Sequence, residues 1–275
     1  MTRIALFQST TGIDPSANAS ALADAIAQAA GGGAEVLFTP EMSGLLDRDA
    51  ARAAKVLREE GEDQVLSAVR EAAAKHKIWV HLGSLAVLLE DGKVANRSFV
   101  IDREGHVRAT YDKIHLFDVD LPTGESWRES NVYSPGKGVV LVNGTPIGKL
   151  GLTICYDLRF PGLFARLAES DADVIAVPAA FTVPTGKAHW HVLLRARAIE
   201  AGLFVVAAAQ VGHHEDGRNT FGHSLVIDPW GEILLDMGEE KGVGFADIDL
   251  KRISDVRSRI PALNHRRAIP AAVTL

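Results

Sequence analysis

The segment KLGLTICYDLRFP, residues 149–161, carries the pattern that decides the fold of this 275-residue chain. Its first half is apolar, and its second half is a polar cluster that follows Cys155 and ends before Pro161. The apolar run predicts a buried strand, and proline is common at the first helical position because its missing N–H has no partner there. The segment therefore predicts a strand, a short loop and a helix, with the only cysteine of the chain at the end of the strand.

Strands and helices alternate on both sides of this segment. Apolar runs predict strands at residues 3–8, 36–38, 174–178 and 203–210, and helical periodicity predicts helices over about 16–30, 62–76 and 189–201. Residues 78–113 predict an antiparallel meander because Asp-Gly and Glu-Gly pairs divide it into three strand-like runs. Asn143-Gly144 indicates a further hairpin, and residues 224–235 another. Mixed strands that alternate with helices predict an α/β fold of large sheets with helices on their outer faces.

Composition limits the classes of function. The chain is 47% hydrophobic and 23% charged with a formal net charge of −6, which predicts a globular protein without a basic face for nucleic acid. We expect a single domain over residues 1–275, because no linker-like stretch interrupts it. No apolar run approaches the roughly 20 residues of a membrane span, and the first residues read as a strand instead of a signal peptide. A lone cysteine forms no internal disulfide, so we expect a reducing compartment, the cytoplasm.

Three reactive residues lie at or near the ends of predicted strands: Glu41, Lys113 and Cys155. A thiol attacks an amide carbonyl as the thiolate, and a neighbouring carboxylate can take its proton and later pass it to the leaving amine. A fixed ammonium and the backbone N–H of Tyr156 could stabilise the oxyanion. Each residue also has a plain alternative, because a lone cysteine is often a small core residue and loop charges are usually solvated. Spacing along the chain does not decide between the two.

Three segments, in this order, resemble the signature of the nitrilase superfamily: Pro40-Glu41, YDKIHLFD at 111–118 and GLTICYDLRFP at 151–161. Later stretches, including residues 178–181, 194–200 and 222–231, are similar to its Nit branch. The resemblance implies a four-layer α-β-β-α sandwich of two mixed sheets with helices outside. It also implies a Glu-Lys-Cys triad at Glu41, Lys113 and Cys155, no metal or organic cofactor, and a homodimer paired through the outer helices.

The family also uses a second glutamate between the lysine and the cysteine. Glu129, followed by Ser130 and then by Pro135-Gly136, matches that pattern, and Glu125 before Ser126 is a competitor with poorer spacing. We expect Glu129 to hold Lys113 and to orient the substrate amide.

Four further residues are candidates for binding substrate. Arg159 resembles the position at which carbamoylase members of the superfamily hold a carboxylate, which a planar guanidinium matches in a bidentate way. Its alternative is a structural ion pair with Asp157 or Asp171. We also expect Tyr156, Phe181 and Thr182 to line the substrate pocket.

Two histidines form an H-x-H pattern at His189 and His191, but metal binding requires further ligands and none is evident nearby, so no metal site is expected. Gly162 and His191 stand where Nit relatives commonly have glutamate. These departures affect the expected pocket rim and not the triad.

The resemblance implies a cysteine-dependent amidase for a small, carboxylate-bearing amide, acting through a thioester and releasing ammonia. Within the Nit branch the chain is more similar to the deaminated glutathione amidases. The alternatives are an omega-amidase for 2-oxoglutaramate or 2-oxosuccinamate, an N-carbamoyl amino acid hydrolase, and a catalytically silent binding or scaffold protein.

Overall fold

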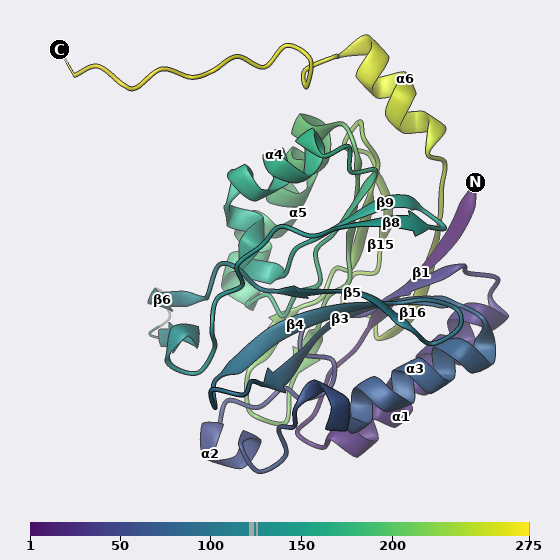
Figure 1. Cartoon of the computed structure of the whole chain (residues 1–275), viewed down its shortest axis with the longest axis vertical. Coiled ribbons are helices and arrows are strands. Elements are labelled where there is room, and N and C mark those ends of the chain that lie inside the picture. The colour runs from purple at the N-terminus through teal and green to yellow at the C-terminus, as the bar shows by residue number, and fades with distance from the viewer. Residues whose placement is uncertain (121–123, 125, 275) are drawn as a thin grey trace.

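Two six-stranded mixed sheets form the body of the molecule, and helices cover the outer face of each (Figure 1). The computed structural model describes residues 1–120, 124 and 126–274. The first sheet has the order β16-β1-β2-β3-β4-β5 and the second β15-β14-β11-β10-β9-β8. The expected four-layer α-β-β-α sandwich is confirmed.

The first sheet is built mainly from the N-terminal half of the chain. Its strands are β1 (Thr2–Gln8), β2 (Val36–Phe38), β3 (Trp79–Leu88), β4 (Val94–Ile101), β5 (Val107–Asp112) and β16 (Gly242–Ile248). β1, β2 and β3 run parallel, whereas β4 and β5 continue as the expected antiparallel meander.

The second sheet repeats this pattern of pairings. Its strands are β8 (Leu141–Thr145), β9 (Gly148–Leu152), β10 (Val174–Ala176), β11 (Phe204–Ala207), β14 (Leu225–Ile227) and β15 (Ile233–Asp236). β9, β10 and β11 run parallel, as β1, β2 and β3 do, and antiparallel strands flank them on both sides. Two copies of one topology therefore face each other, although no sequence repeat is evident.

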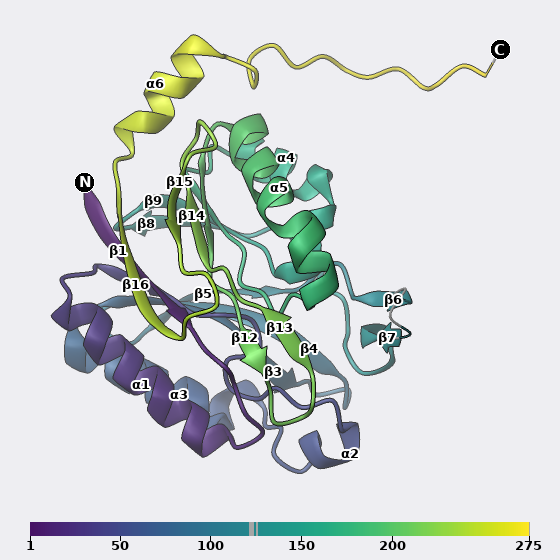
Figure 2. The ribbon, with the colours of Figure 1, turned by 180° about the vertical axis from the view of Figure 1, so that it is seen from behind.

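Helices connect the parallel strands and cover the outer faces. α1 (Pro15–Gly31) and α3 (Gln64–His76) lie side by side on the first sheet, and α4 (Pro161–Glu169) and α5 (Val183–Ala201) lie on the second (Figures 1 and 2). The side chains of Asp14 and Asp63 accept hydrogen bonds from first-turn N–H groups of α1 and α3, which fixes where these helices begin.

Alternation along the strands divides the apolar residues between two cores. In β1, Ile4 and Leu6 face the second sheet, whereas Ala5 packs with α1 and α3. β2 repeats this, with Val36 and Phe38 inside and Leu37 toward the helices. Both faces of these strands are buried, as expected for parallel strands between two layers.

The remaining elements are short or peripheral. They are α2 (Ala50–Ala53), α6 (Lys251–Arg259), the 3-10 turns η1 (Glu60–Glu62), η2 (Glu129–Asn131) and η3 (Cys155–Arg159), the ribbon β6 (Asp118–Asp120) with β7 (Ser126–Arg128), and the ribbon β12 (Val211–His213) with β13 (Asn219–Phe221). After α6 the chain extends away from the body (Figure 1).

Two local predictions are wrong. Asn143-Gly144 lies inside β8 at a shift in register, and the hairpin turn comes later, between Thr145 and Gly148. α5 begins at Val183 and not near His189. Gly186 lies inside this helix, and a Cβ there would lie 2.2 Å from the ring of Phe221. The absence of a side chain at this position therefore lets α5 pack closely against β13.

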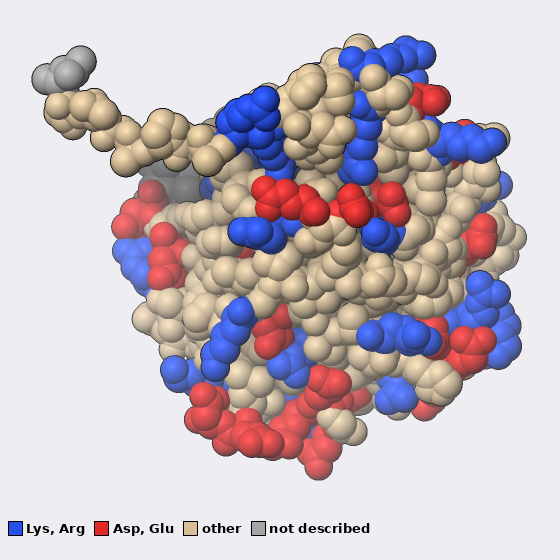
Figure 3. Space-filling view, turned by 45° about the horizontal axis from the view of Figure 1, so that its top comes forward, with Lys and Arg blue, Asp and Glu red and all other residues tan. Residues whose placement is uncertain are grey.

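None of the helices in the described ranges is long and apolar enough to cross a membrane. On the face drawn in Figure 3, positive and negative side chains are interspersed, and the largest cluster of one sign, at the lower edge, is acidic.

The close packing of Gly186 against Phe221 leads to a first prediction. Gly186→Ala should lower the free energy of unfolding by about 1 to 3 kcal/mol, because α5 must move away from β13 to admit the methyl group. Gly162→Ala, in the first turn of α4 with no heavy atom within 4 Å of the added Cβ, is the control and should be neutral or stabilising. Thermal and urea unfolding of both variants measure the difference. Equal stability of the two variants would contradict the tight packing at Gly186.

Candidate active site

Glu41 lies in the loop that follows β2 and is 4% exposed. Its Oε1 accepts hydrogen bonds from Lys113 Nζ at 2.9 Å and Asn96 Nδ2 at 3.0 Å, and its Oε2 accepts one from the N–H of Ala180 at 2.8 Å. The loop passes directly over Gly83, where a Cβ would lie 2.1 Å from the carbonyl oxygen of Thr39. The backbone of Glu41 is thus held against β3, and its carboxylate reaches the second sheet.

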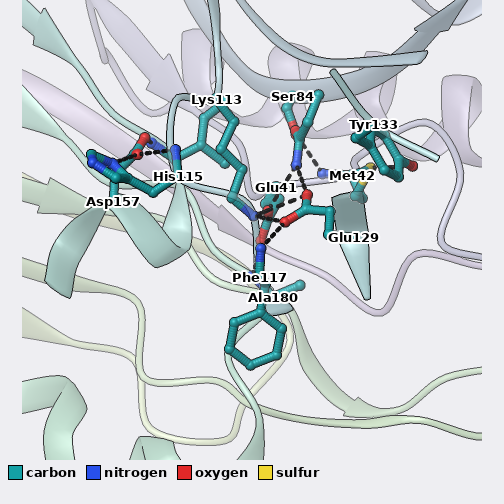
Figure 4. Close-up of polar contacts among 12 residues, drawn as sticks. Glu41, Met42, Ser84, Lys113, His115, Phe117, Glu129, Tyr133, Asp157 and Ala180 are labelled. Atoms are coloured by element: carbon teal, nitrogen blue, oxygen red, sulfur yellow. Dashed lines mark hydrogen bonds and ion pairs between the residues drawn. The ribbon is translucent and has the colours of Figure 1, made fainter. Parts of the chain in front are cut away.

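Lys113 follows β5 and is 2% exposed. Its ammonium lies between two carboxylates, with Nζ 2.9 Å from Glu41 Oε1 and 2.9 Å from Glu129 Oε2 (Figure 4). A buried ammonium requires such compensation, because an isolated charge away from water is very unfavourable.

Glu129 begins η2 and makes the contact with Lys113 that its sequence pattern predicts. Its Oε2 also accepts a hydrogen bond from the N–H of Phe117 at 2.6 Å, which fixes the carboxylate from a second side. The competing candidate, Glu125, lies outside the described residues.

Asn96 belongs to this group but was not predicted. Its Nδ2 donates to Glu41 at 3.0 Å and to Glu129 at 3.1 Å, so one amide links the two carboxylates. It is 1% exposed in the middle of β4. A polar residue at a buried position of the apolar run VANRSFVI was the sign in the sequence.

Cys155 is the first residue of η3, three residues beyond the end of β9, so the strand is shorter than predicted. Its φ of +46° lies in the left-handed region, which costs a residue other than glycine on the order of 1 to 3 kcal/mol. Its N–H donates to the carbonyl oxygen of Pro178 at 2.9 Å, which anchors the turn to the neighbouring loop. Cys155 lines the cavity described below, and the hydrogen bonds of the described residues leave the N–H of Tyr156 free.

Asp157 holds the cysteine turn against the lysine loop. Its Oδ2 accepts hydrogen bonds from Tyr111 Oη at 2.7 Å and from the N–H of Ile154 at 2.9 Å, and its Oδ1 accepts two from His115, at 3.1 Å from the N–H and 2.7 Å from Nδ1 (Figure 4). Asp157 is fully buried and does not pair with Arg159, one of the two structural partners considered for that arginine. The sequence placed it in a polar cluster but did not reveal this role.

Electrostatics at the site favour one arrangement of protons. Burial raises the pKa of Glu41, but the charge of Lys113 and its hydrogen bond outweigh this, so the pKa is below its ordinary value. Burial lowers the pKa of Lys113, and Glu129 and Glu41 more than reverse that effect. Burial, with the charge of Glu41, raises the pKa of the Cys155 thiol well above its ordinary value. At neutral pH the site therefore holds a thiol beside an ionised carboxylate that can accept its proton.

A cavity of about 880 Å³ opens onto Cys155, Glu41 and Lys113. Tyr156, Phe181 and Thr182 line it, as predicted, together with Phe117, Trp127 and Tyr133. Arg159 is not among the described residues that line it. Its guanidinium carbon lies 5.5 Å from the ring centroid of Phe181, and its Nη2 lies 3.3 Å from His189 Nδ1. In this structure Arg159 therefore contacts Phe181, a residue of the cavity wall, instead of lining the cavity itself.

His191 has partners that the sequence did not reveal. It lies with His223 and Asp236, and this cluster offers three possible metal ligands, contrary to the expectation that none lay nearby. His191 Nε2 lies 3.0 Å and His223 Nδ1 2.9 Å from the carboxylate of Asp236. Burial raises the pKa of Asp236, but these histidines and the N–H of Gly238 bring it below its ordinary value. Hydrogen bonding alone accounts for the cluster, which does not line the cavity.

Comparison with known proteins points the same way as the geometry. A family model described as carbon-nitrogen hydrolase matches residues 3–258. A protein from Yersinia enterocolitica named deaminated glutathione amidase is 37% identical over 273 residues, which are 98% of this chain and 94% of the relative. The NitFhit protein of C. elegans has a TM-score of 0.89 at 38% identity, covering 97% of this chain and 65% of that one. A mutant amidase from Nesterenkonia sp. AN1, with acrylamide added at its active-site cysteine, has a TM-score of 0.79 at 27% identity, covering 95% and 98%.

The lowered pKa of Glu41 predicts the acid limit of activity. Protonation of this carboxylate removes the base, so kcat/KM should fall only below the ordinary glutamate value of 4.5. The ion pair with Lys113 is also lost as the pH falls through this lowered pKa, so circular dichroism at each pH must show that the fold persists. An acid limb near pH 6 to 7 in folded protein would contradict the proton arrangement described above.

Proposed function

This chain belongs to the carbon-nitrogen hydrolase family, and on that premise we propose that its amidase reaction proceeds through a thioester on Cys155, with Glu41 and Lys113 completing the triad. The observation that carries the proposal is the buried contact of Lys113 with Glu41 beside the thiol, at the bottom of an open cavity. The chain is a hydrolase of carbon-nitrogen bonds, as its relatives and family model indicate.

Acylation follows from the arrangement of protons. Glu41 takes the thiol proton while Sγ attacks the amide carbonyl carbon, and the resulting oxyanion accepts hydrogen bonds from Lys113 Nζ and the free N–H of Tyr156. Glu41 then gives the proton to the amide nitrogen as the C–N bond breaks. The products of this half-reaction are the free amine and an acyl group bound to Cys155 as a thioester.

Deacylation uses the same groups in reverse. Glu41 takes a proton from a water molecule that attacks the thioester carbonyl, and the oxyanion occupies the same site. Collapse of the intermediate breaks the C–S bond, the proton returns to the sulfur, and the carboxylic acid product leaves. Glu129 and Asn96 act as positioning residues, because they hold the ammonium of Lys113 and the carboxylate of Glu41.

We propose deaminated glutathione as the substrate, because several relatives of 37–43% identity carry that name. The cavity of about 880 Å³ suits a molecule of tripeptide size, since pockets for drug-sized ligands span about 300 to 1,000 Å³. The expected release of ammonia requires correction for this substrate. Both amide nitrogens of glutathione carry carbon substituents, so the leaving group is an amine, whereas omega-amidase substrates release ammonia. Assaying both products distinguishes the two substrate classes.

An apolar patch on the outer face of the second sheet supports a homodimer. Val192 and Ile199 on α5 are 68% and 53% exposed, and Trp230, in the turn between β14 and β15, is 47% exposed. The turn lies against the helix, because the Nε of Arg195 donates to the carbonyl oxygen of Gly231 at 2.8 Å. We propose that a second copy covers this patch, since exposed apolar areas of this kind mark interaction sites.

We also propose that the protein works in the cytoplasm. Cys155 is the only cysteine, and its proposed reaction requires a free thiol, which a reducing compartment maintains.

Substitutions of the triad test the reaction. Cys155→Ala should abolish turnover, and Glu41→Gln and Lys113→Ala should each lower kcat/KM at least about a hundredfold, because the nucleophile, base and oxyanion donor are lost. Hydrolysis of deaminated glutathione and circular dichroism measure activity and fold. If Cys155→Ala kept more than about one percent of the activity, another nucleophile would be required.

Substitutions in the apolar patch test the dimer. The double variant Val192→Glu and Ile199→Glu should shift the protein from dimer to monomer in analytical ultracentrifugation, because four charges would be buried at a two-fold interface. Val139→Glu, at a 43% exposed valine outside this patch, is the control. A wild-type protein that sediments as a monomer would contradict the proposal.

A further inference from the structure

Two arginines meet over one tryptophan in the wall of the active-site cavity. The guanidinium carbons of Arg218 and Arg48 lie 5.0 Å and 5.8 Å from the ring centroid of Trp127. All three residues line the cavity that contains Cys155. They come from three separate segments: the loop before α2, β7, and the loop between β12 and β13. The fold therefore concentrates positive charge at one place in the cavity.

Within the described part of the chain, only one of the two guanidinium groups is neutralised. Asp216, whose side chain is fully buried, accepts hydrogen bonds from Nε of Arg218 at 2.7 Å and from the backbone N–H of Arg48 at 2.9 Å. Nη2 of Arg218 also lies 2.7 Å from Asp216 Oδ2 in the same ion pair. The side chain of Arg48 has no carboxylate partner among the described residues. The nearby carboxylate of Asp47 already pairs with Arg52 at 2.6 Å. Arg48, Arg218 and Asp216 together carry a formal charge of +1.

The catalytic end of the same cavity has the opposite formal charge. Glu41 and Glu129 share a single ammonium, that of Lys113, so the ionised group carries −1. A substrate with a carboxylate is repelled from this end and attracted to the arginines. The cavity thereby favours one orientation of an anionic amide, with its charge away from Cys155.

We propose that Arg48 and Arg218, stacked on Trp127, form the subsite for the carboxylate on the leaving-amine side of the substrate. The inference rests on the proposed function. In deaminated glutathione the glycine carboxylate is six bonds from the scissile carbonyl carbon, and the oxo-acid carboxylate is four bonds away. Arg48 is exposed and Arg218 is half-buried, so the subsite lies toward solvent and fits the more distant carboxylate. This site determines specificity for amides with a charged amine portion.

A comparison of three substrates tests the subsite. Arg48→Gln should raise KM for deaminated glutathione at least about tenfold with little change in kcat, because a remote contact binds the ground state and transition state alike. KM should change little for the same molecule with a terminal carboxamide in place of the glycine carboxylate, or for 2-oxoglutaramate, which lacks that portion. Arg166→Gln, at an arginine of α4 that is 68% exposed, controls for the loss of one positive charge.

Arg218 requires a milder change, because its removal would leave Asp216 buried without a cation. Arg218→Lys keeps the charge but loses the planar fork, so it should show the same selective rise in KM with an unchanged melting temperature. An equal rise in KM for all three substrates would show that the arginines only hold the cavity wall in shape, and would overturn the proposal.

Binding to the inert Cys155→Ala protein separates the subsite from the reaction. Calorimetry with deaminated glutathione should show at least about tenfold weaker binding when Arg48→Gln is added, and no such loss for the carboxamide. If the wild type fails to hydrolyse deaminated glutathione but this selective binding persists, the subsite stands and the proposed substrate fails. If hydrolysis occurs and the binding loss is not selective, the proposed function stands and the subsite is overturned.

Discussion

The ammonium of Lys113, buried between two carboxylates, is the constraint on which the rest of the site depends. Removing these charges from water is costly, and it is tolerated because Nζ contacts Glu41 and Glu129 directly and Asn96 links the two acids. The three charged groups come from the ends of β2 and β5 and from η2, so the pairing fixes three loops relative to one another. The same pairing keeps Glu41 ionised and lets it act as a base beside a thiol that burial keeps protonated. The buried ion pairs of Lys113 therefore determine both the relative positions of the three loops and the protonation of Glu41.

The second sheet brings Cys155, the proposed nucleophile, to this group. The two sheets have the same pattern of parallel and antiparallel pairings, and their inner faces bury one common core. Packing them face to face places the loops beyond their parallel strands at a common edge. Three hydrogen bonds connect the two halves: one from the N–H of Ala180 to Glu41, and those from Tyr111 and His115 to Asp157. These contacts hold the strained turn at Cys155 in position, and the catalytic group exists only where the two halves meet.

The cavity extends this organisation from chemistry to recognition. It contains the proposed triad, and aromatic side chains line its walls together with the two arginines. The negative charge at the catalytic end and the positive charge of the arginine pair lie at different places in the cavity, so an anionic substrate is favoured in one orientation. A uniform apolar pocket would not impose that orientation. The separation of charge selects among amides by the charge they carry beyond the scissile bond. Specificity and catalysis are thus assigned to different segments of the chain.

Much of this protein was determined by sequence alone. Apolar periodicity located nearly all the major elements, and three short segments around Glu41, Lys113 and Cys155 identified the family, because these patterns are local and each residue type has a restricted chemistry. Glu129 was also found from its flanking residues.

The tertiary structure alone decided the rest. Asn96, Asp157 and Arg218 are ordinary polar residues in the sequence, and their roles come from partners that lie between 2 and 55 positions away along the chain. Gly186 allows α5 to pack closely against Phe221, and Arg159, expected to bind substrate, contacts Phe181 instead of lining the cavity. Local sequence determines the conformation and chemistry of a residue. Which residues become its neighbours depends on how the two sheets pack, and no local sequence pattern contains that information.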